Sequence, residues 1–223
     1  MSEKKIKAVL WDMDGTLFNT KRGIELAIRD AVKDVGLPAP VGNEVDRFIG
    51  PPIQYTFKEF YGVSEERSKE IAALFRTYYR EKGYVLESDI YPGLLDIITK
   101  LKEEGCLMAV CTLKKQDMAE RIVEHNGLKP IFDSVIGTDA VDSIKKHDTI
   151  RMTCEKFGIK EENAVLIGDT DYDALGAEKA GCLFIGVTYG FGFKGKEDID
   201  PYPNIGTASS AEDILKLISD YDG

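Results

Sequence analysis

Short and almost purely apolar stretches recur along the chain, and each of them ends in small or acidic residues. They are the runs IKAVLW (residues 6–11), LMAVC (107–111), SVIG (134–137), AVLIG (164–168) and LFIGVTY (183–189). Apolar runs without alternating polar positions are typical of strands that are buried on both faces, as in a parallel sheet. The pattern therefore predicts a parallel β-sheet built from these stretches.

Between these runs, hydrophobic residues recur at helical spacing. The spacing predicts helices over residues 93–104, 116–126 and 148–157. Each of these segments is followed by a glycine, the usual residue just past the end of a helix. Strands that alternate with helices indicate an α/β fold, and here they predict a doubly wound parallel sheet, which is a Rossmann-like core.

One long segment interrupts this alternation. Residues 20–89 contain no apolar run of strand type, only helical spacing, and Ser64 is a suitable N-cap for a helix within the segment. We therefore expect an all-helical cap domain over residues 20–89, inserted into a core made of residues 1–19 and 90–223. The flanking segments GTLFNT and SDIYPG are suitable as two hinges between the parts.

Composition and charge narrow the possible partners. The 223 residues are 43% hydrophobic and 30% charged, which is ordinary for a globular protein. The formal net charge of -10 excludes the broad basic surface that a nucleic acid polymer requires. An anionic substrate would need a local arrangement of cations or a bound metal ion, because the overall field would repel it.

The cysteines and the hydrophobic profile bear on the cellular compartment. Four cysteines occur without a CxxC pair, and only two histidines are present, so the spacing of a zinc site is absent. The cysteines are expected to be reduced and buried. No stretch is long enough to span a membrane, and the N-terminal apolar run is too short for a signal peptide. We expect a cytoplasmic protein without a membrane partner.

Polar residues of types that are used in catalysis and metal binding follow several of the predicted strands. They are Asp12 and Asp14, Thr112, Lys145 or Lys146, and Asp169 with Asp173. The carboxyl ends of parallel strands meet at one edge of the sheet, where α/β proteins bind their ligands. We therefore expect these side chains to lie close together although they are far apart in the sequence.

A group of carboxylates in one small site predicts a metal ion. Neighbouring carboxylates repel one another unless a cation neutralises them, and ligation by oxygen without histidine suits Mg²⁺. A carboxylate, a metal ion, a lysine and a threonine hydroxyl together are suited to phosphoryl transfer. Mg²⁺ would also let an anionic substrate approach an acidic chain.

These residues resemble the four signatures of the haloacid-dehalogenase-like hydrolases. The matching pieces are DMDGTL (residues 12–17), Cys111 with Thr112, a lysine at 145 or 146, and GDTDYDALGAEKAG (168–181). Their order and spacing also match, over nearly the whole chain. The helical insertion and the segments FIGPPIQYTF, YYREKG and YPGLLDIITKLKEEG are similar to the phosphoglycolate-phosphatase-like branch. Four signatures in order are far more specific than any one of them.

The resemblance implies a role for each residue. Asp12 would be the nucleophile that becomes an aspartyl phosphate, and Asp14 would protonate the leaving oxygen and later take a proton from water. Thr112 and the lysine would hold the phosphoryl oxygens. Asp12, Asp169 and the backbone carbonyl of Asp14 would bind Mg²⁺, with Asp173 either a direct ligand or one shell further out.

Because two lysines are consecutive, it stays open which of them would hold the phosphoryl oxygens. Many relatives carry a lysine followed by a proline-containing run, whereas this chain reads DSIKKHDTIRM and has no proline to fix the register. Matching KHDTI to the pattern of the branch favours Lys146. Lys145 remains the alternative.

The implied activity is that of a Mg²⁺-dependent phosphatase acting on a small phosphorylated metabolite. Asp14 argues against a dehalogenase, because a halide needs no protonation. The substrate would be a phosphate monoester, either phosphoglycolate-like or a nucleotide. A phosphomutase of the β-phosphoglucomutase type is the alternative, and a non-catalytic binding or regulatory module is a distant one. The sequence does not determine the oligomeric state.

Substrate contacts are expected from the cap and from the loops near the nucleophile. GPPIQYTF (residues 50–57) is expected to form a loop that closes over the site. The candidate substrate-binding residues are Gly15, Leu113, Arg47 and Gln54, with Arg76 and Lys21 as further basic residues of the cap. GFGFKG (190–195) matches GxGxxG but is not followed by an apolar helix, so it predicts a loop at a strand end and not a dinucleotide site.

Overall fold

The core is built around one parallel sheet of six strands. The computed structural model describes residues 6–221, in which the strand order is β5-β4-β1-β6-β7-β8. The strands are β1 (Ala8–Trp11), β4 (Leu107–Lys115), β5 (Ser134–Thr138), β6 (Ala164–Gly168), β7 (Leu183–Val187) and β8 (Gly206–Ala208). The chain starts in the middle of the sheet and extends it first to one side and then to the other, which confirms the predicted doubly wound fold.

Helices cover both faces of this sheet. They are α4 (Leu94–Glu103), α5 (Gln116–His125), α6 (Lys146–Phe157), α7 (Asp171–Ala180), the short α8 (Lys196–Ile199) and α9 (Ala211–Ser219), with a 3₁₀ turn η3 at Glu161–Asn163. Val9 and Trp11 of β1 face the cluster that contains α4, α5 and α9, whereas Ala8 and Leu10 face the cluster that contains α6 and α7. Neighbouring strand residues point to opposite faces, so both faces of β1 must be apolar. This is why the predicted strands read as uninterrupted hydrophobic runs.

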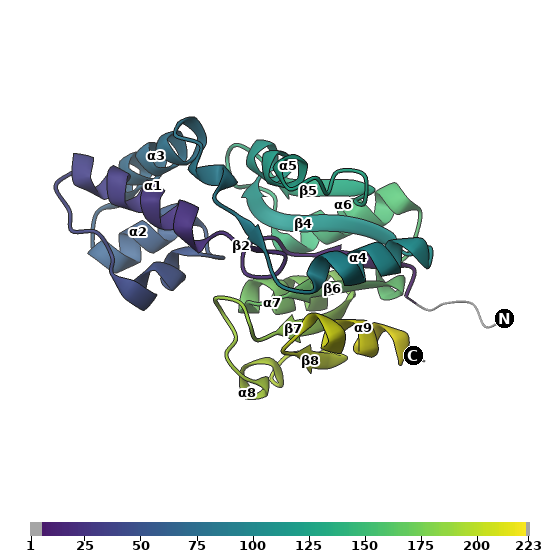
Figure 1. The fold of residues 1–223 in the computed structure, drawn as a ribbon. Coiled ribbons are helices and arrows are strands. Elements are labelled where there is room, and N and C mark those ends of the chain that lie inside the picture. The colour runs from purple at the N-terminus through teal and green to yellow at the C-terminus, as the bar shows by residue number, and fades with distance from the viewer. Residues whose placement is uncertain (1–5, 222–223) are drawn as a thin grey trace.

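A second, helical lobe lies beside the sheet (Figure 1). It consists of α1 (Lys21–Asp34), α2 (Ile53–Tyr61) and α3 (Glu65–Glu81), with 3₁₀ turns η1 (Gly42–Phe48) and η2 (Tyr84–Leu86). Its centre is aromatic: the ring centroids of Phe48 and Phe57 are 5.3 Å apart, and those of Phe57 and Phe75 are 6.2 Å apart. The hydroxyl of Ser64 caps α3 by accepting a hydrogen bond from the Arg67 backbone N–H.

The two segments that were expected to be hinges lie against each other. β2 (Phe18–Asn19) and β3 (Asp89–Ile90) form a short antiparallel pair, and the Tyr91 N–H donates to the Leu17 carbonyl at 3.1 Å. The chain therefore leaves the core and returns to it at one place. The exact domain limits at residues 19/20 and 89/90 stay a prediction.

Two local expectations differ from the structure, and one strand was not predicted. Only Gly50 to Pro52 form a turn, because α2 already begins at Ile53, so the loop predicted over residues 50–57 is wrong in its second half. Helix α6 begins at Lys146, two residues earlier than expected, and β8 is too short and too weakly apolar to be recognised in the sequence.

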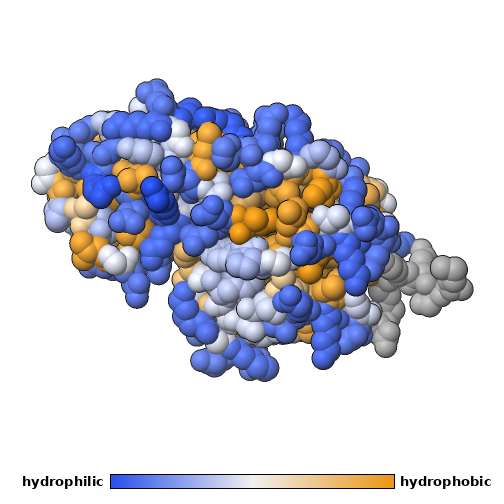
Figure 2. All heavy atoms as spheres, in the orientation of Figure 1, coloured by the Kyte–Doolittle hydropathy of each residue, from blue (hydrophilic) through white to orange (hydrophobic). Residues whose placement is uncertain are grey.

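The surface and the cysteines agree with a globular protein. Figure 2 shows hydrophilic residues over most of one face, with hydrophobic residues gathered near its centre. All four cysteines are buried free thiols. Within residues 6–221, no helix combines the length and the apolar character that crossing a membrane requires.

The central strand offers a test of the fold. Leu10 of β1 is fully buried, so Leu10→Ala is expected to lower the free energy of unfolding by about 2–5 kcal/mol through lost burial and a cavity. Leu95 of α4 is 47% exposed, and Leu95→Ala should change it by no more than about 0.5 kcal/mol. Urea unfolding of both variants measures the difference, and equal losses would contradict the placement of β1.

Candidate active site

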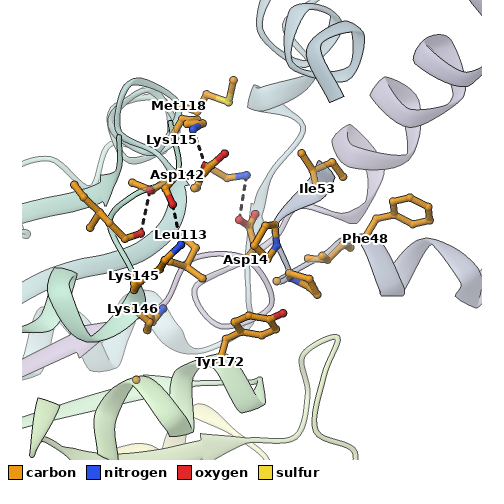
Figure 3. A pocket seen from close by; sticks show the side chains of 18 of the residues that line it. Asp14, Phe48, Ile53, Leu113, Lys115, Met118, Asp142, Lys145, Lys146 and Tyr172 are labelled. Atoms are coloured by element: carbon orange, nitrogen blue, oxygen red, sulfur yellow. Dashed lines mark hydrogen bonds and ion pairs between the residues drawn. The ribbon is translucent and has the colours of Figure 1, made fainter. Parts of the chain in front are cut away.

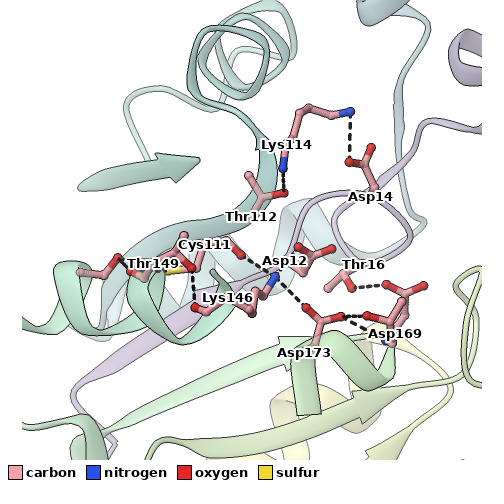
Figure 4. A network of polar contacts seen from close by, with 12 residues as sticks. Asp12, Asp14, Thr16, Cys111, Thr112, Lys114, Lys146, Thr149, Asp169 and Asp173 are labelled. Atoms are coloured by element: carbon pink, nitrogen blue, oxygen red, sulfur yellow. Dashed lines mark hydrogen bonds and ion pairs between the residues drawn. The ribbon is translucent and has the colours of Figure 1, made fainter. Parts of the chain in front are cut away.

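The candidate residues converge at the carboxyl edge of the three central strands. Asp12 directly follows β1, Thr112 lies in β4, and Asp169 directly follows β6. Strands β4 and β6 pair with β1 on either side, so the three residues come to the same edge. Figure 4 shows their side chains together with those from the starts of α6 and α7.

Lys146 is the cation at the centre of this edge. It is the first residue of α6, and its side chain is only 4% exposed. Its ammonium forms an ion pair with Asp12, lies 2.6 Å from Oδ1 of Asp173 and donates to the carbonyl of Cys111 at 2.7 Å. Gly176 of α7 packs against the Lys146 side chain so closely that a Cβ there would overlap it.

The neighbouring Lys145 takes no part in this arrangement. Its side chain is exposed, and its Nζ donates to the carbonyl of Asp142 at 3.0 Å. Of the two lysines that the sequence left open, the structure therefore brings Lys146, and not Lys145, to Asp12.

Three buried carboxylates gather beside this lysine. Asp12, Asp169 and Asp173 each offer an oxygen, and these oxygens lie within 4.8 Å of one another. Oδ2 of Asp173 accepts hydrogen bonds from the backbone N–H of Thr170 at 3.0 Å and from the Thr170 hydroxyl at 2.7 Å, so the carboxylate is fixed. The bond from the backbone N–H also caps the start of α7.

A glycine-rich loop holds the third carboxylate. Oδ2 of Asp169 accepts from the N–H groups of Phe191 at 2.8 Å and Gly192 at 3.2 Å, and its Oδ1 accepts from the hydroxyl of Thr16 at 3.0 Å. A Cβ at Gly190 or at Gly15 would overlap this carboxylate. GFGFKG is thus a loop at a strand end, as expected, but its role in fixing Asp169 was missed; its closely spaced glycines were the available signal.

The electrostatics of the cluster favour a bound cation. Burial raises the pKa of Asp12 to about 8; the Lys146 ammonium lowers it, and the carboxylates of Asp173 and Asp169 raise it. Burial and Asp173 also raise the pKa of Asp169 to about 7. The carboxylates of Asp12 and Asp173 raise the pKa of Lys146 although burial alone would lower it. One lysine does not neutralise three carboxylates, and their oxygen-only donor set fits Mg²⁺.

Asp14 points away from this cluster and toward the helical lobe. Its Oδ2 lies 3.0 Å from Nζ of Lys114, and its Oδ1 accepts a hydrogen bond from the hydroxyl of Thr20. Lys114 is 8% exposed and also donates to the hydroxyl of Tyr79 of α3 at 3.2 Å. The carboxylate is thus held by Lys114 of β4, which also bonds to the lobe, and by Thr20, which directly precedes α1.

Lys114 was not singled out from the sequence. Its position two residues after Thr112 in a strand was the available signal, since residues two apart share one side of a strand. The backbone N–H of Lys114 donates to the Thr112 hydroxyl at 3.1 Å, which ties the two residues together.

Two connected spaces open at this edge. A small chamber of about 20 Å³ is bounded by Asp12, Asp14, Thr112 and Lys146, among others. A cavity of about 470 Å³ adjoins it between the helical lobe and the core (Figure 3). The nucleophile candidate and the acid–base candidate therefore both border the small chamber.

The expected substrate contacts are distributed unevenly around these spaces. Leu113 borders both of them, and Arg76 borders the larger one. Arg47 and Gln54 border neither; the guanidinium of Arg47 lies 5.1 Å from the ring centroid of Phe60 and faces a separate surface hollow. Gly15 packs against Asp169, as described above.

Comparison with known proteins agrees with this architecture. Residues 9–187 match the family described as haloacid dehalogenase-like hydrolase. A 5'-nucleotidase from Pseudomonas aeruginosa is 31% identical over 186 residues, which cover 82% of this chain and 83% of the relative. A phosphoglycolate phosphatase from Vibrio parahaemolyticus is 30% identical over 200 residues, which cover 86% and 87%.

A solved structure extends the likeness to three dimensions. The crystal structure of a predicted phosphatase from Clostridium acetobutylicum has a TM-score of 0.89 and 30% sequence identity, and the match covers 97% of this chain and 99% of that one. The family match, the two relatives and the solved structure agree with one another. The chain therefore belongs to the haloacid dehalogenase-like hydrolase family.

Proposed function

We propose that this hydrolase is a Mg²⁺-dependent phosphatase that cleaves a small phosphate monoester through an aspartyl phosphate on Asp12. The observation that carries the proposal is the placement of the Asp12 carboxylate. It lies in the same small chamber as Asp14 and Thr112, paired with Lys146 and next to Asp169 and Asp173. The phosphatase and nucleotidase names of the relatives support the same reaction class.

In the first half of the reaction, an oxygen of Asp12 attacks phosphorus. The bond from phosphorus to the ester oxygen breaks, and Asp14 gives that oxygen a proton, so the substrate leaves as a neutral alcohol. Lys146 and the hydroxyl of Thr112 hold the other phosphoryl oxygens and offset their growing charge.

In the second half, water attacks the phosphorus of the aspartyl phosphate. Asp14, now a carboxylate, takes a proton from the water, and the bond between phosphorus and the Asp12 oxygen breaks. Inorganic phosphate leaves and both aspartates return to their starting states. Lys114 and Thr20 keep the Asp14 carboxylate in one place through both steps.

A metal ion would complete the charge balance of the site. Asp12, Asp169 and Asp173, with the main-chain carbonyl of Asp14, would hold Mg²⁺, which supplies positive charge for the phosphoryl oxygens when it is bound. Lys146 then neutralises the remaining negative charge between Asp12 and Asp173.

The nucleophile is tested by removing its charge. Asp12→Asn should reduce phosphate release by at least about a thousandfold, because an amide is a poor nucleophile for phosphorus. The assay uses phosphoglycolate, nucleoside monophosphates, pyrophosphate and hexose phosphates, with Mg²⁺ or with a chelator. Asp96→Asn, at an exposed position of α4, is the control. Release that survives in Asp12→Asn would refute the proposal, and phosphoryl transfer without release would point to a mutase.

The two adjacent lysines form a matched pair of variants. Lys146→Ala should lower kcat by about a hundredfold to a thousandfold, because it removes the charge that faces Asp12 and the phosphoryl group. Lys145→Ala should lower kcat by no more than about threefold, since that side chain is directed at the Asp142 carbonyl. Circular dichroism checks that both variants are folded. Similar losses in both would contradict the assignment of Lys146.

The raised carboxyl pKa values predict how Mg²⁺ affects stability. In metal-free protein, the folded state keeps protons on Asp12 and Asp169 up to about pH 8 and 7, whereas the unfolded state loses them near the usual value of 3.8. The stability that these protons give the folded state is fully present below pH 3.8. It is lost as the pH rises through the folded pKa values of about 7 and about 8. Mg²⁺ should therefore raise Tm more at pH 8 than at pH 5.

Thermal unfolding of metal-free and Mg²⁺-loaded protein at the two pH values measures this effect. Asp169→Asn should lose most of the increase in Tm, because it removes one carboxylate ligand. An increase in Tm that is the same at both pH values, or larger at pH 5, would contradict the metal site.

A further inference from the structure

The chamber and the larger cavity share a wall, and that wall identifies where the two halves of a substrate would lie. The residues that border both spaces are Asp14, Gly50, Leu113, Lys114, Lys146 and Tyr172. Asp12 and Thr112 border only the small chamber of about 20 Å³, so the phosphoryl group that Asp12 attacks would lie on that side. Asp14 stands at the junction, where the ester oxygen that it protonates would lie. The leaving group must then extend into the larger cavity.

We propose that this cavity selects a phosphate monoester of a ring-bearing alcohol of nucleoside size over the phosphate ester of a two- or three-carbon acid. The proposal rests on the phosphatase function described above and names its substrate class. It is argued from the volume of the cavity, from its lining and from the pairing of its charges.

The volume is the first argument. About 470 Å³ is within the range of about 300–1,000 Å³ that is typical of sites for drug-sized ligands. A two-carbon leaving group would leave most of this space to water. Contacts far from the reacting bond raise kcat/KM only when the substrate reaches them, so a cavity of this size favours a larger alcohol.

The lining is the second argument. The helical lobe contributes Phe48, Ile53 and Phe75 to the wall, and the core contributes Leu113, Met118 and Leu175. The ring of Tyr172 lies below Phe48, Ile53 and Leu113 in Figure 3 and adds a flat surface at the junction with the chamber. Apolar walls stabilise a ligand in proportion to the apolar area that it buries, and flat rings bury the most area for little loss of rotational freedom.

The charges are the third argument. Both lysines that border the chamber already have carboxylate partners, Lys114 with Asp14 and Lys146 with Asp12. The carboxylate of a two-carbon acid would have to stay close to the chamber, and there it would compete with Asp14 and Asp12 for these lysines. A neutral alcohol has no such conflict.

Further out, the cavity offers hydrogen-bond donors. Nζ of Lys115 lies 2.6 Å from Oδ1 of Asp142, and a terminal nitrogen of Arg76 lies 3.1 Å from its Oδ2. One carboxylate between two cations leaves a net positive charge in this wall. The planar guanidinium of Arg76 can donate to acceptors on a ring edge or stack on the ring itself, which suits a nucleobase.

A cavity-filling variant tests the proposal. In wild type, kcat/KM for AMP and UMP is expected to exceed that for phosphoglycolate and glycerol phosphate by at least about tenfold. Ile53→Trp places a larger side chain in the cavity and should lower kcat/KM for the nucleotides by about tenfold, mainly through KM, while changing that for phosphoglycolate by no more than about twofold. Tyr55→Trp, on the same helix, is the control, because Tyr55 is 56% exposed and does not border the cavity.

The outcomes separate this proposal from the phosphatase function. Release that depends on Asp12 but favours phosphoglycolate, or equal losses for both substrate types in Ile53→Trp, would overturn the substrate class alone. Absence of release from every substrate, or release that is unaffected by Asp12→Asn, would overturn the phosphatase function itself. Thermal unfolding of Ile53→Trp and Tyr55→Trp checks that both variants are folded.

Discussion

The arrangement of the active site depends on one buried ammonium group, that of Lys146, between the carboxylates of Asp12 and Asp173. A buried charge is strongly unfavourable unless partners compensate it, so the lysine and the carboxylates fix one another. The fold meets this requirement with several separate elements. Helix α6 begins at the lysine, α7 approaches closely at Gly176, and β4 supplies the Cys111 carbonyl.

The same electrostatic constraint explains why the site is suited to phosphoryl chemistry. Even with Lys146, three buried carboxylates leave an excess of negative charge. Burial, and after it the neighbouring carboxylates, raise the pKa values of Asp12 and Asp169. The proposed divalent cation would remove the excess and at the same time create a place for a phosphate. An acidic chain with a net charge of -10 can therefore attract an anion at one local point.

In the proposed function, the groups that react and the groups that select the substrate lie in different parts of the molecule. The chamber is built by residues of the core together with Gly50 of the helical lobe, whereas the larger cavity has extensive walls from both parts. Lys114 connects the two parts, because it is bonded to Asp14 of the core and to Tyr79 of the lobe. A change of lobe residues can thus alter the leaving group that is accepted while the nucleophile and its neighbours stay the same.

Local sequence patterns predicted the alternation of strands and helices, the helical insertion and the positions of Asp12, Asp14 and Asp169 after buried strands. Thr112 was expected just after its strand but lies within β4. Hydrophobic periodicity is a local property, and parallel strands necessarily bring their carboxyl ends to one edge. The strand β8 was missed because its three residues carry almost no pattern.

Tertiary structure alone decided which of Lys145 and Lys146 faces Asp12, which residues surround the cavity, and what holds Asp14 and Asp169. Arg47 and Gln54 lie in the helical lobe, as expected, but do not border the cavity. Lys114 was not expected at the site, and it lies where the cavity meets the chamber. The physical reason is that a side chain's direction and its partners depend on how distant elements pack against each other. Spacing along the chain does not contain that information.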